Sequence, residues 1–169
     1  MILRRIFFRR WKRLQINKTN YKMSTEKKYK SMSVEMRRVD DAFHFEALGG
    51  DKIVTHIDAA AAIGGSNAGT RPMELILMGL GSCAAIDIIL ILKKMKQDVS
   101  DFRIVIEGQR DAVANPSPFE TIEVRFILRG GNLVQKKVEQ AVQLSMEKYC
   151  SVSAMLEKAA TITWKAEIE

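Results

Sequence analysis

Cysteine and histidine are scarce in this sequence, which has two of each among 169 residues. Cys83 and Cys150 lie far apart in the chain, so no closely spaced cysteine pair forms a zinc motif. His44 and His56 are expected on opposite or distant faces of the first strands, because successive side chains of a strand alternate between its two faces. We therefore expect no bound metal, and two cysteines also exclude a disulfide-dense secreted scaffold.

Outside the first 30 residues, acidic side chains outnumber basic ones. These residues hold 11 of the 27 Lys and Arg side chains and one of the 20 acidic ones, Glu26. The remaining residues hold 16 basic and 19 acidic side chains, so the body is mildly acidic although the whole chain has a formal net charge of +7. A domain that binds nucleic acid needs basic side chains on its folded part to neutralise phosphates. We expect no nucleic-acid partner.

The first 33 residues lack the features of a secretory signal, since Arg and Lys interrupt the apolar runs and no small-residue cleavage site follows. Leu3, Phe7, Trp11 and Leu14 have helical spacing between basic residues, a pattern that can lie on an anionic membrane surface. The alternative, which we favour, is a disordered tail or an extension translated from too early a Met. We therefore expect a basic leader over residues 1–33 without membrane contact, a folded domain over residues 34–169, and a cytoplasmic protein.

The rest of the sequence alternates strand-like and helix-like patterns, without an internal repeat, a low-complexity segment or a phosphate-binding βαβ unit. This order predicts one α+β domain with antiparallel sheet. The expected elements are two or three antiparallel strands within 34–58, a helix over 73–92, a strand hairpin over 102–110 and 120–129, a helix over 134–149, a shorter helix from about 151 or 153, and a strand over 161–168.

Few polar side chains interrupt residues 73–92, and the length of this segment alone would permit a membrane span. Against a span, Asp87 would lie well inside the bilayer at a cost of ~3 kcal/mol, and Glu74 would add to the penalty. A helix that is apolar on all sides in a soluble chain is a core helix. We expect it to be buried within the protein or against a partner subunit, with Gly79 and Gly81 permitting close approach of another backbone.

The two cysteines carry the clearest chemistry. Cys83 lies within the expected helix among small residues, which can leave a thiol accessible in an apolar pocket. Apolar surroundings raise the pKa of a thiol, so a reactive Cys83 needs a cation from elsewhere, and Arg71 and Arg110 are the candidates. Cys150 lies at a junction between two helices, where a helix N-terminus and Lys148 would favour its thiolate. The alternative is that both cysteines are inert buried thiols.

The segments that contain these cysteines resemble two motifs of a known family. Residues 72–83, PMELILMGLGSC, resemble the core-helix motif of the OsmC/Ohr-like family, and residues 148–153, KYCSVS, resemble its second-cysteine motif. Gly108-x-Arg110 and Pro118-Phe119 in the intervening hairpin are similar to the same region of many members. The resemblance covers roughly residues 34–169.

This resemblance implies an intertwined homodimer, in which antiparallel sheets from both subunits wrap around buried central helices and the active sites lie at the subunit interface. It also implies a thiol-dependent peroxidase, in which a hydroperoxide oxidises Cys83 and Cys150 resolves the product as a disulfide. An unknown dithiol reductant restores the thiols, and no metal or organic cofactor is needed. The implied function is reduction of organic hydroperoxides in defence against oxidative stress.

The sequence departs from the family pattern at Met73. In well-characterised hydroperoxide reductases, the position after the motif's Pro holds a Glu that pairs with the activating Arg. Glu74 is one residue further along, about 100° around the helix, so it does not simply inherit this role. The resemblance therefore does not assign the activating pair, and Arg71, Arg110 and Glu74 are the candidates to activate or support the thiolate. The alternative function is a dimeric protein that binds a small hydrophobic molecule or senses redox state.

Overall fold

The computed structural model describes residues 28–50 and 52–169. Every helix and strand described below lies in one compact unit, residues 33–169. The expectations for the basic leader fall mostly on residues 1–27 and so lie outside the described residues.

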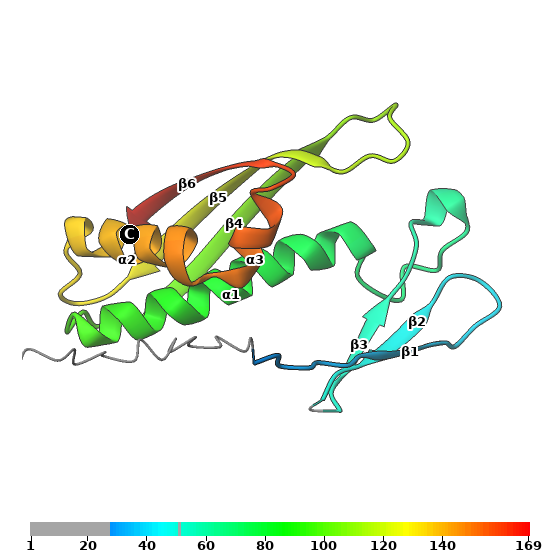
Figure 1. Cartoon of the computed structure of the whole chain (residues 1–169), viewed down its shortest axis with the longest axis horizontal. Coiled ribbons are helices and arrows are strands. Elements are labelled where there is room, and N and C mark those ends of the chain that lie inside the picture. The colour runs from blue at the N-terminus through cyan, green and yellow to red at the C-terminus, as the bar shows by residue number, and fades with distance from the viewer. Residues whose placement is uncertain (1–27, 51) are drawn as a thin grey trace, which may run out of the picture. The chain divides into compact units, whose positions relative to one another are not determined.

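Three short strands form the first sheet, with all neighbours antiparallel, as the sequence predicted (Figure 1). Their order in the sheet is the order in the chain: β1 (Glu35–Arg38), β2 (Phe45–Leu48) and β3 (Val54–Ile57). Ala47 is buried, whereas β1 is exposed throughout and β3 is exposed except at Ile57.

The prediction that His44 and His56 lie on opposite or distant faces is wrong. The register pairs Glu46 with His56, and His44 lies two residues before Glu46, so all three share one face of the sheet. The ring nitrogens His44 Nε2 and His56 Nδ1 are 2.9 Å apart. Alternation along one strand does not reveal which residue of the next strand lies opposite, and this register brought the two rings together.

The helix α1 (Pro72–Lys94) begins with Pro72 in its first turn, where the missing N–H is not needed, and ends with Lys93 and Lys94, which favour a helix C-terminus. One stripe at helical spacing is fully buried: Leu80, Ala84, Ile88 and Leu92. The helix contacts α2, η2, α3 and β4, so the predicted core helix is confirmed for this stripe.

The rest of α1 carries exposed apolar side chains, at Met78, Ile86, Ile89 and Leu90. Within the described residues, α1 is the one helix long and apolar enough to cross a membrane, a test that the core helix of a soluble protein also passes. An added Cβ at Gly81 would lie 2.7 Å from Cδ1 of Ile106, so this glycine makes room for a side chain of β4 instead of the backbone that was expected.

The second sheet has the order β4-β5-β6 and consists of β4 (Asp101–Arg110), β5 (Phe119–Arg129) and β6 (Thr161–Ile168). The antiparallel hairpin β4–β5 confirms the predicted one. β6 pairs with β5 in parallel, so this sheet is mixed and the expectation of purely antiparallel sheet is wrong here. Parallel neighbours need a long crossover, and three helices between β5 and β6 supply it.

Those three helices are α2 (Gln135–Leu144), η2 (Ser145–Tyr149) and α3 (Ser151–Leu156). The sequence predicted one helix to about residue 149, and the last five residues of that span form a π-helix. Val138, Ala141 and Val142 of α2 are buried against α1 and the sheet. The core therefore lies between the second sheet and these helices, with α1 crossing it (Figure 1).

Candidate functional site

Cys150 lies at the N-cap of α3 and is 2% exposed. Its Sγ accepts a hydrogen bond from the backbone N–H of Ser153 at 3.3 Å and donates to the carbonyl oxygen of Leu80 at 4.0 Å. The first bond is that of an N-cap side chain, and the second ties the thiol to α1. The junction between η2 and α3 therefore fixes this sulfur against the central helix.

The π-helix η2 and its first residue also hold this junction in place. The N–H of Cys150 donates to the carbonyl of Ser145 at 2.8 Å, closing the wide π turn. The buried Ser145 hydroxyl donates to the carbonyl of Ala84 at 3.1 Å. Leu80 and Ala84 are one turn apart on α1, and Cys83 lies between them. π-turns inside helical segments occur often at functional sites, and this one brings the second cysteine to the first.

Cys83 is half-buried on α1 and packs against the edge of the core. The Cys83 thiol lies close enough to Cys150 to raise its pKa, but both cysteines are free and the two sulfurs are not at disulfide distance. The structure therefore brings together the two residues that the sequence singled out. The remaining candidates, Arg71, Arg110 and Glu74, lie elsewhere.

Burial raises the pKa of the Cys150 thiol to about 11. The N–H of Ser153 acts in the opposite direction, and the neighbouring Cys83 thiol raises the pKa further. The N–H groups of Ser153 and Val152 at the helix N-terminus do lower the pKa in the expected direction, but burial outweighs them, and Lys148 is not among the causes. α3 has six residues and too small a dipole to offset burial, and the Lys148 ammonium lies 5.5 Å from the centroid of the Tyr149 ring.

Arg71 is the N-cap residue of α1, and its guanidinium is held by the preceding loop. It donates to the carbonyl of Gly69 at 3.0 Å, to the carbonyl of Asp58 at 3.3 Å and to the Asn67 side chain. These acceptors are neutral, so the guanidinium charge has no carboxylate partner among the described residues. No hydrogen bond in the described part of the chain joins Arg71 to either sulfur.

The loop that holds Arg71 is organised around the buried carboxylate of Asp58, which is 1% exposed. It accepts hydrogen bonds from the N–H groups of Ala59, Ser66 and Ala68 and from the Ser66 hydroxyl, at 2.7 to 3.0 Å. The N–H of Ala68 is the largest cause lowering the pKa of Asp58 to about 2, with burial opposing it and the Ser66 hydroxyl assisting. Asp58 is not among the residues predicted from the sequence, because its role depends on the folded loop and no local motif indicates it.

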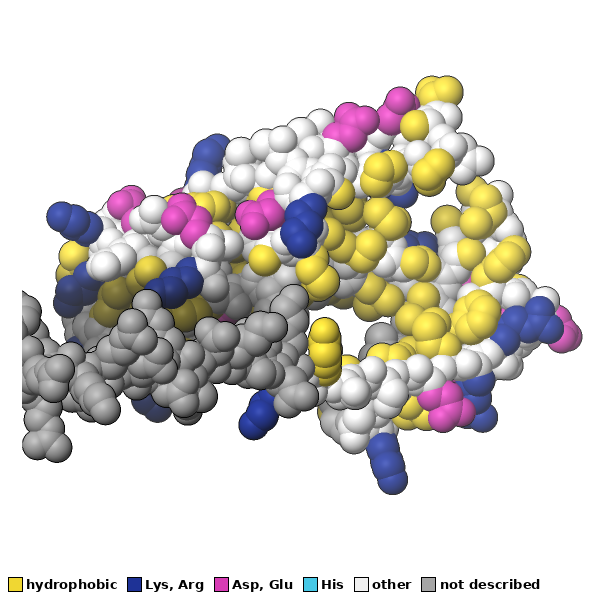
Figure 2. Space-filling model, in the orientation of Figure 1, with side chains coloured by type: hydrophobic (Ala, Val, Ile, Leu, Met, Phe, Trp, Pro, Cys, Tyr) yellow, Lys and Arg dark blue, Asp and Glu magenta, His cyan; other side chains and the backbone are white. Residues whose placement is uncertain are grey.

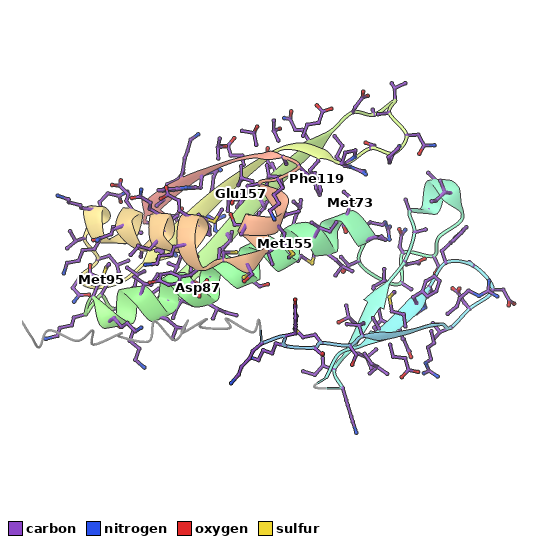
Figure 3. All side chains as sticks on the ribbon, in the orientation of Figure 1. Met73, Asp87, Met95, Phe119, Met155 and Glu157 are labelled. Carbon is purple, nitrogen blue, oxygen red and sulfur yellow. The ribbon has the colours of Figure 1, made fainter. Side chains whose placement is uncertain are left out.

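Glu74 caps the start of α1, since its carboxylate accepts a hydrogen bond from the N–H of Arg71 at 3.0 Å. Met73, at the position where the family pattern has Glu, is partly buried and packs against the core. Figure 3 labels Met73 in the first turn of α1 and Met155 on α3. The first turn of α1 thus presents a thioether to the core and uses its carboxylate for capping.

Arg110 ends β4, and its guanidinium lies 5.8 Å from the centroid of the Phe119 ring and donates to the carbonyl of Ser117 at 3.3 Å. Phe119 is buried, and its ring lies over Gly108, where an added Cβ would be 2.4 Å from a ring carbon. The Gly108-x-Arg110 and Pro118-Phe119 segments therefore form one unit, in which glycine admits the ring and arginine covers it.

An apolar groove of about 510 Å³ runs between α1 and β4. Neither cysteine lines it, and its walls come mainly from Leu77, Met78, Gly81, Phe102, Ile104 and Ile106, with Glu74 and Ser82 at its edge. Exposed hydrophobic side chains also gather around the first half of α1 (Figure 2). Among the described residues, no group of three or more His, Cys, Asp or Glu side chains could hold a metal ion.

One known protein family matches most of the folded part of the chain. Residues 64–165 match the OsmC-like protein family. Protein YhfA of Escherichia coli K12 is 46% identical over 97 residues, which are 57% of this chain and 72% of YhfA. The crystal structure of a hypothetical protein from Aquifex aeolicus VF5 has a TM-score of 0.70 and 34% identity, covering 83% of this chain and 99% of that one.

A more distant structure is an organic hydroperoxide resistance protein from Elizabethkingia anophelis. It has a TM-score of 0.65 and 12% identity, and the match covers 85% of this chain and 99% of that one. At this identity the likeness concerns the fold alone.

Proposed function

This chain belongs to the OsmC-like protein family, and on that premise we propose that it reduces organic hydroperoxides with its two cysteines, in defence against oxidative stress. The observation that carries the proposal is the position of the Cys150 sulfur against the Leu80 carbonyl of α1, three residues before Cys83, with both thiols free. The two cysteines come from elements far apart in the sequence, and a two-cysteine reductase requires two thiols in one neighbourhood.

The proposed reaction balances with thiols alone. The Cys83 thiolate attacks the outer oxygen of ROOH, the O–O bond breaks, and RO⁻ takes a proton to leave as ROH, with Cys83 left as a sulfenic acid. The Cys150 thiol then attacks the Cys83 sulfur, which forms a disulfide and releases water. A dithiol reductant of unknown identity returns both cysteines to thiols. No organic cofactor or metal takes part.

The order of the two steps follows from burial. Cys150 is 2% exposed and its pKa is raised to about 11, so little of it is thiolate near neutral pH. Cys83 is more exposed and is therefore proposed as the first to meet peroxide. Arg71, Arg110 and Glu74 are retained as groups that would support it from a partner subunit, since within this chain none of them hydrogen-bonds a sulfur.

The proposed assembly is an intertwined homodimer in the cytoplasm, built from residues 34–169, with residues 1–33 as a basic leader. The support is the outer side of α1, where Met78, Ile86, Ile89 and Leu90 are between 45% and 61% exposed in a single chain. A second copy would cover this surface and complete the surroundings of Cys83.

The test is thiol counting before and after one equivalent of cumene hydroperoxide. Wild-type protein should lose two thiols and regain both with a dithiol. Cys150→Ser should lose its remaining thiol and stop as a sulfenic acid that dimedone traps, whereas Cys83→Ser should consume almost no peroxide. Peroxide consumption by Cys83→Ser at the wild-type rate would reject the mechanism.

The alternative function, binding of a small hydrophobic molecule, is favoured by the apolar groove of about 510 Å³ between α1 and β4, which neither cysteine lines. It predicts that both cysteine variants bind an apolar fluorescent probe as wild type does, and that peroxide changes no thiol count. A redox sensor would instead form the disulfide once, without turnover in excess dithiol.

A further inference from the structure

We propose that His44 and His56 form a binding site for a divalent transition metal ion on the outer surface of the first sheet, separate from the cysteines. The two are the only histidines of the chain, and they meet across two strands. His44 is half-buried beside β2, and His56 is exposed on β3. An ion can therefore reach the pair from solvent.

The separation of the two rings suits chelation. His44 Nε2 and His56 Nδ1 are 2.9 Å apart, and the ring centroids are 5.1 Å apart with an interplanar angle of 41°. Two imidazole nitrogens bound to one metal at about 2.0–2.1 Å are about 2.9 Å apart when they subtend a right angle. The two nitrogens share one hydrogen bond in the absence of an ion, so metal binding would turn both rings by roughly 45° and move the shared proton to the other nitrogen of its ring.

The backbone holds the pair in this arrangement. Glu46 pairs directly with His56, and the N–H of His44 donates to the Asp40 carboxylate at 3.2 Å. The carbonyl of His44 accepts from the N–H of Val39 at 2.9 Å. Because hydrogen bonds and strand pairing fix the backbone at both histidines, ion binding would order little further chain.

A carboxylate lies beside the pair. Glu46 is on the same face of the sheet, and both of its hydrogen bonds with Arg37 use Oε2, at 3.1 and 2.6 Å. Among the described residues, Oε1 accepts no hydrogen bond and could accept one from a metal-bound water. With two protein nitrogens and the other positions filled by water, the site fits an exchangeable ion that prefers imidazole, such as Cu²⁺, Ni²⁺ or Zn²⁺.

The experiment is titration of the full chain without a purification tag, in a Cys83→Ser/Cys150→Ser background because thiolates also bind these ions. NiCl₂ or CuCl₂ is added in competition with a chromophoric chelator at pH 7.5. One ion per chain is expected, with an affinity that falls at least tenfold in His44→Ala and equally in His56→Ala. The double variant should be no weaker than either single one.

Thr55→Ala is the matched control, since Thr55 lies on β3 next to His56 but on the other face of the sheet, and it should bind as the parent does. Electron paramagnetic resonance of the Cu²⁺ complex of the parent protein requires no folded histidine variant and should show two nitrogen donors. One nitrogen donor, or binding that either single variant leaves unchanged, would overturn the proposal. This result is independent of peroxide chemistry, so the two proposals can fail separately.

Discussion

Two opposing influences act on the pKa of the Cys150 thiol, and one is larger than the other. A helix N-cap favours a thiolate and burial disfavours it, and burial is the larger effect here, raising the pKa to about 11 from an ordinary value of 9.0. The motif around Cys150 was readable from the sequence, but the extent of its burial was not. Burial depends on Leu80 and Ser145, which the fold alone brings to it.

The raised pKa predicts slow alkylation of Cys150. In Cys83→Ser at pH 8, iodoacetamide should react with Cys150 more slowly than with an ordinary thiol, because burial, the largest cause of the raised pKa, remains in this variant and only the thiolate reacts. The rate should still be rising above pH 9. The same protein in guanidinium chloride is the control and should react with an ordinary pKa. A folded-state pKa below 9 would contradict the burial argument.

The same shift has a consequence for stability. Because the folded-state pKa is raised, folding favours the protonated thiol, and this contribution is fully present below the unfolded-state pKa. It is lost as the pH rises from about 9 to about 11. Cys150 is therefore one source of alkaline destabilisation of this protein.

Asp58 behaves in the opposite sense and gives a second prediction. Its folded-state pKa is lowered to about 2, so its contribution is present above the ordinary value of 3.8 and is lost as the pH falls toward 2. Asp58→Asn should lower the Tm at pH 7 by ~5 °C or more, because an amide cannot accept all four hydrogen bonds. The difference from wild type should shrink below pH 3.

Asp41→Asn is the matched control, since Asp41 is exposed and its carboxylate makes no hydrogen bond within the described residues. It should leave the Tm at pH 7 nearly unchanged. Equal melting temperatures of Asp58→Asn and Asp41→Asn would show that the loop does not depend on the buried carboxylate.

Among the elements, the hairpin β4–β5 depends on one absent side chain. At Gly108 an added Cβ would lie 2.4 and 2.6 Å from two carbons of the Phe119 ring, which is buried and cannot shift freely. Gly108→Ala should therefore destabilise the fold by about 1–3 kcal/mol, measured by urea unfolding. Gly131→Ala, where nothing lies within 4 Å, should have little effect. Similar unfolding midpoints for the two variants would contradict the steric argument at Gly108.

The element order was predictable because hydrophobic periodicity and turn residues are local signals, and β6 falls at residues 161–168 as expected. Strand partnership is not local. Nothing within residues 161–168 indicates that they run parallel to β5. Likewise, the sequence around His44 and His56 does not indicate that the two side chains meet when β2 and β3 pair. For the same reason the sequence does not predict the hydrogen bonds of Arg71 to Asp58 and Gly69, because these form only in the folded loop.

Across the whole molecule, charge and apolar surface are unevenly distributed. The formal charge of +7 arises in residues 1–30. The folded unit over residues 33–169 carries ion pairs on both sheets, as at Arg37–Glu46 on the first and at Arg125–Glu167 and Lys165–Glu123 on the second. Such exposed pairs contribute little stability individually. The apolar side of α1 is the surface that single-chain packing leaves unexplained.

That surface leads to the last prediction, that Ile86→Lys converts a dimer into a monomer. Ile86 is 61% exposed in one chain and belongs to the outer stripe of α1 with Met78 and Ile89. A lysine there would be solvated in a monomer, but its charge would be buried without a partner in a dimer. Light scattering at micromolar concentration should give about twice the chain mass for wild type and the mass of one chain for the variant.

Gln140→Lys, on the exposed side of α2, adds the same charge away from this stripe and should remain a dimer. If dimerisation completes the surroundings of Cys83, the Ile86→Lys monomer should also lose most of its peroxide consumption while Gln140→Lys keeps it. A wild-type protein that is monomeric and well folded at these concentrations would contradict the assembly, and the apolar stripe of α1 would then need another partner.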